Sequence, residues 1–281
     1  MKWITVAIAL LLSPLIFCGN DIDPDFLAWM NANLQPSEVA KIVRDDLVTG
    51  SFGGGVYNGN STDRPVILVH GLNNEAGNFW KIRQDFVALG FPVQRIFASS
   101  WGRGAEAFNT NVKLECEYVQ DIRRFIQVVL AYTGAAQVDV GGYSLGSPLA
   151  RKAILGGSCV DNTTVNLGAP LTDKIHTYLS VAGANQGSYL CLLPLVPICS
   201  TTNGLSCSSK FLKDINTPSN YEATYKSFNI ASTNDEVVGY YACAKKASQF
   251  TGAEETQISG KSHTETEYDT ADIQLPLLRQ G

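Results

Sequence analysis

Several features that mark other protein classes are missing from this chain of 281 residues. It has no run of basic residues and a formal net charge of −5 at pH 7, which argues against a nucleic-acid partner. It has no Cys-x-x-Cys motif and no His–Cys cluster, which argues against a structural metal site. Beyond the N-terminal run, no segment is long and apolar enough to cross a bilayer. Internal repeats and low-complexity tracts are also missing, so one domain is the simplest organisation.

The N-terminal residues have the pattern of a secretory signal peptide. Lys2 precedes an apolar run over residues 3–17, and polar residues follow at once. The run is shorter than the roughly 20 residues that a membrane span needs. A lipoprotein box would require a smaller residue than Phe17 before Cys18. We therefore expect a signal peptide over residues 1–19, a secreted, extracellular protein, and a single domain over residues 20–281.

Cysteine number and acceptor motifs suit an exported chain. Removal of Cys18 leaves an even number of cysteines, which predicts up to three disulfides without fixing their pairing. The equal spacing of Cys191, Cys199 and Cys207 predicts a local bridge in that loop. Two Asn-x-Thr motifs, beginning at Asn60 and Asn162, are glycosylation acceptors if the host glycosylates, and otherwise polar loops. The six remaining cysteines are Cys116, Cys159, Cys191, Cys199, Cys207 and Cys243.

Apolar runs typical of strands alternate with stretches whose apolar residues recur at helical spacing. Residues 65–71 are a short apolar run bounded by breakers, as expected of a fully buried parallel strand. Further strands are expected over residues 92–97, 138–140, 160–167, 177–182 (alternatively a short helix) and 225–230. Helices are expected over residues 26–34, 39–47, 78–89, 112–132 and 149–155. Three glycines at 53–55 predict a flexible linker or a tight packing turn. The alternation predicts an α/β fold, a mostly parallel sheet with helices on both faces.

The pentapeptide Gly142-Tyr143-Ser144-Leu145-Gly146 lies where a strand pattern gives way to a helix pattern. A serine hydroxyl is a poor nucleophile unless a base takes its proton and the backbone presents its oxygen. A sharp strand-to-helix turn presents it, and small residues two positions before and after let the backbone turn that tightly. Pro148 suits the first helical turn, and glycines at 156 and 157 supply a helix stop. Ser144 is therefore the candidate nucleophile, an ordinary Gly-rich turn being the alternative.

Only three histidines are available as a base for Ser144. His70 ends a strand far upstream, and His176 lies in a polar connection. His263 lies in a polar loop after the last expected strand, where the functional groups of open α/β sheets gather. The order serine, acid, histidine is the one expected of an elbow-type hydrolase. We therefore assign His263 as the general base, the alternative being a surface histidine.

The acid must precede His263 and follow a strand. Asp235 lies in a turn between two apolar stretches, well placed to orient the imidazole and to stabilise its cation. The adjacent Glu236 is the second candidate. A turn cap is the alternative use of Asp235, because aspartate frequently caps turns.

Two backbone N–H groups are expected to receive the developing oxyanion. One belongs to Leu145, at the N-terminus of the helix that follows Ser144. We assign the second to Leu72, in the loop that ends the first buried strand. His70 would then brace this loop without moving a proton.

At these residues the chain resembles the class 2 lipases of the α/β-hydrolase superfamily, which are small secreted triacylglycerol lipases and esterases, and it is most similar to their nematode branch. The resemblance lies in residues 65–72 and 142–152 and extends from about residue 26 to about residue 263. A third segment, residues 183–188, is similar to a family Gly-Ala-Asn-His-Gly segment, with Gln186 in place of the histidine. That departure concerns local packing or loop position and leaves the triad untouched. The resemblance implies a triad of Ser144, Asp235 and His263, and ester hydrolysis without a cofactor.

Residues 189–199 are unusually apolar for a connection bounded by cysteines. They could form part of a lid or acyl-binding wall over Ser144, exposing apolar surface at a lipid–water boundary. Alternatively, they form a loop packed on the core and held by disulfides.

The leading expectation for function is a monomeric enzyme that hydrolyses carboxylic esters through an acyl-enzyme, with lipid esters as the foremost substrates. The alternatives are an esterase for small or polymer-bound esters and a non-catalytic protein that binds lipids or a partner.

Overall fold

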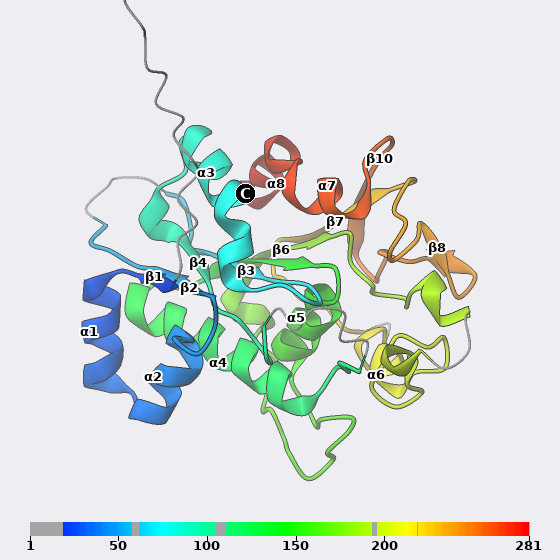
Figure 1. Ribbon diagram of the computed structural model, residues 1–281, viewed down its shortest axis with the longest axis horizontal. Coiled ribbons are helices and arrows are strands. Elements are labelled where there is room, and N and C mark those ends of the chain that lie inside the picture. The colour runs from blue at the N-terminus through cyan, green and yellow to red at the C-terminus, as the bar shows by residue number, and fades with distance from the viewer. Residues whose placement is uncertain (1–18, 58–61, 105–110, 193–195, 218, 281) are drawn as a thin grey trace, which may run out of the picture.

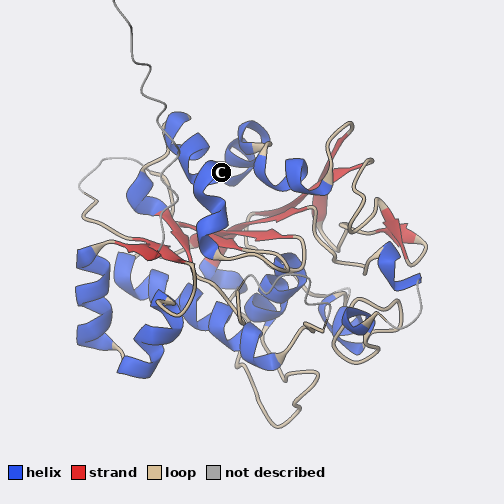
Figure 2. Cartoon of the chain, viewed as in Figure 1, coloured by secondary structure: helices blue, strands red, loops and turns tan. Residues whose placement is uncertain are grey.

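The computed structural model describes residues 19–57, 62–104, 111–192, 196–217 and 219–280. Nearly all of the expected signal peptide, and the acceptor at Asn60, lie outside these ranges. An eight-stranded sheet with the strand order β1-β2-β4-β3-β5-β6-β7-β10 runs through the molecule (Figure 2). Among the described strands of this sheet, only β2 and β4 pair antiparallel, so the predicted mostly parallel sheet is confirmed. The strands are β1 (Gly19–Ile22), β2 (Thr49–Gly53), β3 (Val66–Val69), β4 (Ile96–Ala98), β5 (Val138–Tyr143), β6 (Ile175–Val181), β7 (Lys226–Ser232) and β10 (Ala253–Ile258).

Helices cover both faces of the sheet, as the sequence predicts (Figure 1). On one face lie α1 (Pro24–Asn33), α2 (Pro36–Val43), α4 (Cys116–Thr133) and α5 (Gly146–Leu155). On the other lie α3 (Trp80–Ala88) and α8 (Ala271–Leu278). Two clusters of buried apolar side chains correspond to these two layers. Two short helices, α6 (Lys210–Ile215) and α7 (His263–Tyr268), and a small hairpin, β8 (Tyr241–Ala242) with β9 (Lys245–Lys246), complete the fold. Among the described residues, no helix combines the length and apolarity of a membrane span.

Helix α4 shows how local signals and tertiary contacts together set an element. Val119, Ile122 and Ile126 recur at helical spacing and are buried, and the helix ends where Gly134 takes a left-handed conformation at φ 65°. The sequence predicts a start at residue 112, but the helix begins at Cys116. The reason is a backbone hydrogen bond from Leu114 N–H to the Asn203 carbonyl, which holds the preceding residues outside the helix.

Two strand predictions need correction. Residues 160–167 form a loop with one isolated bridge, between Ser158 and Asn166, because the N–H of Val165 turns back to the carbonyl of Asn162. The stretch 92–97 is extended only at its end, where a short 3-10 helix over Val93–Arg95 leads into β4. His176, expected in a polar connection, lies within β6.

The three glycines at 53–55 form a packing turn instead of a linker. All three have positive φ, between 97° and 133°. A Cβ at Gly54 would lie 2.4 Å from the Cβ of Phe26, and a Cβ at Gly53 would lie 2.5 Å from the ring of Phe97. Close backbone approach to buried aromatic rings therefore requires glycine here.

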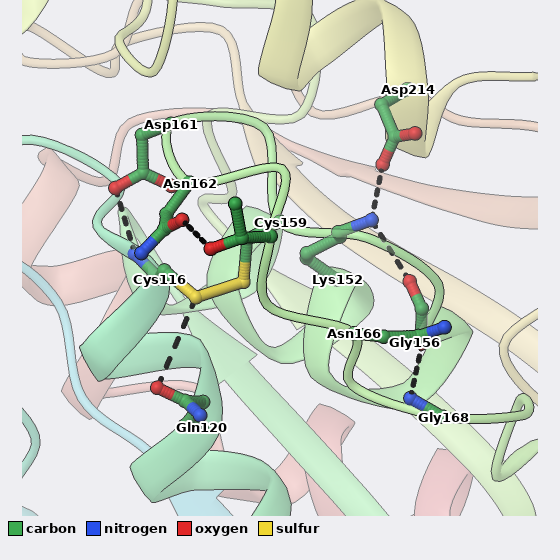
Figure 3. Close-up of a disulfide and its surroundings, with 11 residues drawn as sticks. Cys116, Gln120, Lys152, Gly156, Cys159, Asp161, Asn162, Asn166, Gly168 and Asp214 are labelled. Atoms are coloured by element: carbon green, nitrogen blue, oxygen red, sulfur yellow. Dashed lines mark hydrogen bonds and ion pairs between the residues drawn. A yellow bond between two sulfur atoms is a disulfide. The ribbon is translucent and has the colours of Figure 1, made fainter.

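Three disulfides join the cysteines in the pairs Cys116–Cys159, Cys191–Cys199 and Cys207–Cys243. The local bridge predicted in the apolar loop is the second pair, while Cys207 reaches the turn of the β8–β9 hairpin. The first pair links the start of α4 to the loop after α5, beside the ion pair of Lys152 and Asp214 at 2.6 Å (Figure 3).

Candidate active site

Ser144 lies in the turn between β5 and α5, with φ at 50°. This left-handed conformation is costly for a residue with a Cβ, and the surrounding backbone holds it. The Ser144 N–H donates to the Val181 carbonyl at 3.0 Å, and the Ser144 carbonyl accepts from the N–H of Ala184 at 3.2 Å. Hydrogen bonds to the end of β6 and to the segment after it therefore fix the turn that presents the hydroxyl.

The glycines around Ser144 allow three backbone segments to approach. A Cβ at Gly146 would lie 2.2 Å from the carbonyl oxygen of His70, and one at Gly142 would lie 2.7 Å from the Cα of Ser147. A Cβ at Gly71 would lie 2.8 Å from the Cβ of Ser144. Separations below 3 Å do not occur for real Cβ atoms, so the elbow needs glycine at these positions.

The three residues assigned as a triad meet in one chain of hydrogen bonds. The Nε2 atom of His263 lies 2.9 Å from the Oγ of Ser144. On the other side of the ring, Nδ1 lies 2.8 Å from Oδ2 of Asp235. All three side chains are buried, with exposures of 6–9 %. Residues 119 positions apart in sequence thus come within hydrogen-bonding distance.

His263 is the first residue of α7 and not part of a loop. Ser262 caps that helix in a capping box with Glu265, which fixes where the helix begins. The backbone N–H of His263 donates to the Glu236 carboxylate at 3.0 Å. Glu236, the second candidate for the acid, therefore holds the backbone at His263, while Asp235 contacts the ring.

Asp235 both caps a turn and contacts the imidazole, so the two uses weighed for it coexist. Its Oδ1 accepts from the N–H groups of Val237 at 2.9 Å and Val238 at 2.8 Å, leaving Oδ2 for His263. Burial raises the pKa of Asp235, but its hydrogen bond and charge interaction with His263, together with the two backbone donors, give a net lowering. Asp235 is thus held as a carboxylate facing the ring.

The pKa of His263 is shifted by opposing influences. Burial lowers it, while the hydrogen bond to Asp235 and the negative charges of Glu267, Asp235 and Glu236 raise it. The net direction is upward, so the site stabilises the imidazolium more than water does.

The two N–H groups assigned to the oxyanion belong to Leu145, directly after Ser144, and to Leu72, in the loop after β3. Leu145 is buried at the start of α5, and Leu72 follows Gly71, which packs on Ser144. No acceptor within the described part of the chain takes either N–H. The assignment of both groups to the oxyanion stays a prediction.

His70 is part of the wall of this loop. Its Nε2 accepts from the backbone N–H of Trp101 at 3.1 Å, so Nδ1 carries the proton and donates to the Gly71 carbonyl at 2.8 Å. The ring stacks on Trp101 with 4.8 Å between centroids. Burial lowers the pKa of His70 to about 4, so it stays neutral near pH 7. These contacts agree with the structural role expected of His70 from the sequence, which is to brace this loop.

Sequence reasoning missed Glu267, a buried carboxyl whose Oε2 lies 4.0 Å from Nε2 of His263. Its position four residues after His263 is a helical neighbour, so recognition of the Ser262–Glu265 capping box could have found it. Gln186, the departure from the family pattern, instead anchors its loop. Its amide donates to the Gln249 carbonyl at 2.8 Å and accepts from Lys245 at 3.3 Å.

A mostly parallel sheet with helices on both faces and a serine on a strand-to-helix elbow defines the α/β-hydrolase fold. More narrowly, the chain belongs to the class 2 lipase family, whose model, described as "Lipase (class 2)", matches residues 63–276. It is accordingly a carboxylic ester hydrolase of the lipase and esterase type.

Solved structures share this fold at low sequence identity. The mature form of lipase BlEst2 from Bacillus licheniformis is 13 % identical with a TM-score of 0.55, over 80 % of this chain and 96 % of that one. An esterase from Exiguobacterium antarcticum is 11 % identical with a TM-score of 0.50, over 82 % of this chain and 94 % of that one. Lipase B from Aspergillus fumigatus is 13 % identical with a TM-score of 0.51, over 74 % of this chain and 48 % of that one.

Proposed function

We propose that this protein is a secreted serine hydrolase that cleaves carboxylic esters through an acyl-enzyme on Ser144. Lipid esters are the foremost substrate class in this proposal. His263 acts as general base and Asp235 as the acid that orients it. The observation that carries the proposal is the unbroken series of contacts from Ser144 Oγ to His263 Nε2 and from His263 Nδ1 to Asp235 Oδ2, at 2.9 and 2.8 Å.

In the first step, the Oγ of Ser144 bonds to the ester carbonyl carbon while its proton passes to Nε2 of His263. The carbonyl electron pair moves onto oxygen, and the N–H groups of Leu72 and Leu145 stabilise the resulting oxyanion. Collapse of this intermediate expels the alcohol, which takes the proton from Nε2. Water then repeats the sequence on the acyl-enzyme, releasing the carboxylic acid and restoring Ser144.

Secretion, a signal peptide over residues 1–19 and a single domain over residues 20–281 belong to the same proposal. The N-terminal charge and apolar pattern supports it, as do three disulfides, which persist in oxidising compartments. The acceptor at Asn162 lies in an exposed loop, which suits glycosylation in a host that glycosylates.

Two observations bear on the size of the ester. In the apolar segment between Cys191 and Cys199, Leu192 is 76 % exposed, which suits contact with lipid. By contrast, a cavity of about 150 Å³ is lined by Leu72 and partly by polar side chains, including Asn73 and Glu115. None of the triad residues lines this cavity, but if an acyl group enters it beside Leu72, a volume below the ~300 Å³ usual for ligand pockets favours the second candidate, an esterase for small esters.

Labelling with a fluorophosphonate tests the proposal, because this reagent bonds covalently to an activated serine. We expect the wild-type protein to be labelled and Ser144→Ala to be unlabelled. An unlabelled wild-type protein would support the non-catalytic binding alternative, and undiminished labelling of Ser144→Ala would place the nucleophile elsewhere.

Rates on short- and long-chain p-nitrophenyl esters then separate an esterase from a lipase. A rate that does not rise when a short-chain ester passes its solubility limit would count against a lid formed by residues 189–199.

A further inference from the structure

One buried carboxyl group beside the triad has no part in the mechanism above. Glu267 lies on α7, four residues after His263, and is 3 % exposed. Its Oε2 lies 4.0 Å from Nε2 of His263, the atom that receives the serine proton. Its Oε1 is buried without a hydrogen-bond partner among the residues described. A buried carboxyl oxygen without a hydrogen-bond partner costs free energy.

The groups that face Glu267 come from three parts of the fold. His263 and Tyr268 lie on its own helix, Asp235 follows β7, and Tyr143 ends β5. The backbone of Gly71 approaches as well, since a Cβ built there would lie 3.4 Å from Oε1. The imidazole of His263 is the only basic group in this set.

We propose that Glu267 is a second positioning residue of the catalytic histidine, which acts on the Nε2 side of the ring while Asp235 acts on the Nδ1 side. This inference rests on the proposed function. When Ser144 transfers its proton to Nε2, the ring becomes a cation between two carboxyl groups. Above about pH 7, where Glu267 is ionised, its negative charge stabilises this cation, so less free energy is needed to form the tetrahedral intermediate. Glu267 neither accepts nor donates a proton in the cycle.

The test compares the pH dependence of kcat/KM for p-nitrophenyl butyrate in the wild-type protein and in Glu267→Gln, a neutral side chain of nearly the same shape. An opposite charge at this distance raises the pKa of a histidine by about one unit or more. Because Glu267 is partly protonated below pH 7, the acid limb of Glu267→Gln is expected about half a pH unit lower, and its plateau above pH 7 about three- to tenfold lower. Glu267→Asp keeps the carboxylate and should restore most of both effects.

Asp272→Asn is the matched control, because it removes one negative charge from an exposed position on α8. It should leave both the acid limb and the plateau unchanged. A Glu267→Gln variant with a wild-type acid limb would overturn the proposal, even if its stability had changed. If this variant does not fold, an NMR pH titration of the wild-type protein takes its place. The Nδ1–H resonance of His263 is then expected to titrate in two coupled steps, and a single step contradicts the inference. Failure of the proposed function is distinguishable, since the wild-type protein would then resist fluorophosphonate labelling.

Discussion

At the residue scale, the site combines backbone strain with buried charge. Ser144 is held at a φ of 50°, a conformation that costs about 1–3 kcal/mol for a residue other than glycine. Burial raises the pKa of Glu267 from its ordinary value of 4.5 to about 7, which shows that its ionised form is poorly accommodated. Both features lower the free energy of unfolding, and both lie within contact of His263. The site therefore reduces stability in return for a reactive serine.

The cost of Glu267 can be measured through its pH dependence. Between about pH 4.5 and pH 7 the folded protein retains a proton on Glu267 that the unfolded chain has lost, so stability falls as the pH rises through this window. The full cost, about 3 kcal/mol, is present above pH 7. We expect Glu267→Gln to unfold at a higher urea concentration than the wild-type protein at pH 8. The difference between the two midpoint concentrations should shrink toward pH 4.5. An equal difference at both pH values would show that burial does not raise the pKa of Glu267.

At the scale of elements, the strands that could be predicted from the sequence are the buried ones. Strands β3 and β5 are buried along their whole length, and in β3 a continuous apolar run between breakers predicts such a strand directly. Strand β10 was missed because Ala253–Ile258 is a half-exposed edge strand rich in Glu and Gln, and only its pairing with β7 defines it. The opposite error arose at residues 160–167, where β-branched residues suggested a strand but no partner strand pairs with them.

The disulfides offer a prediction at this scale, because the chain-entropy model relates stabilisation to loop length. Cys116–Cys159 closes a separation of 43 residues and Cys191–Cys199 one of 8. Replacing the first pair by serine should lower the free energy of unfolding by about 4 kcal/mol, and replacing the second by about 2.5 kcal/mol. Cys207–Cys243, with a separation of 36, is the matched comparison and should resemble the first. Urea unfolding measures all three, and a larger loss for the 8-residue pair would contradict the model.

At the scale of the whole molecule, the parallel topology brings together residues that are distant in sequence. The elbow follows β5, Asp235 follows β7, and α7 with His263 follows β10, so all three leave the sheet at the carboxyl ends of parallel strands. The order of these elements along the chain was readable from the sequence, which is why the three residues could be assigned. The contact of His263 with Glu267 was not predicted, because the sequence pattern placed His263 in a loop and did not indicate helix α7.

The most direct test of the account measures kcat/KM for p-nitrophenyl butyrate in Ser144→Ala, His263→Ala and the double variant, with the Asp272→Asn control beside them. If serine and histidine act as one unit, each single variant loses at least about 10⁴-fold in kcat/KM, and the double variant loses no more than either single one. A His263→Ala enzyme within tenfold of the wild-type rate, or losses that multiply in the double variant, would contradict the shared proton transfer on which the account depends.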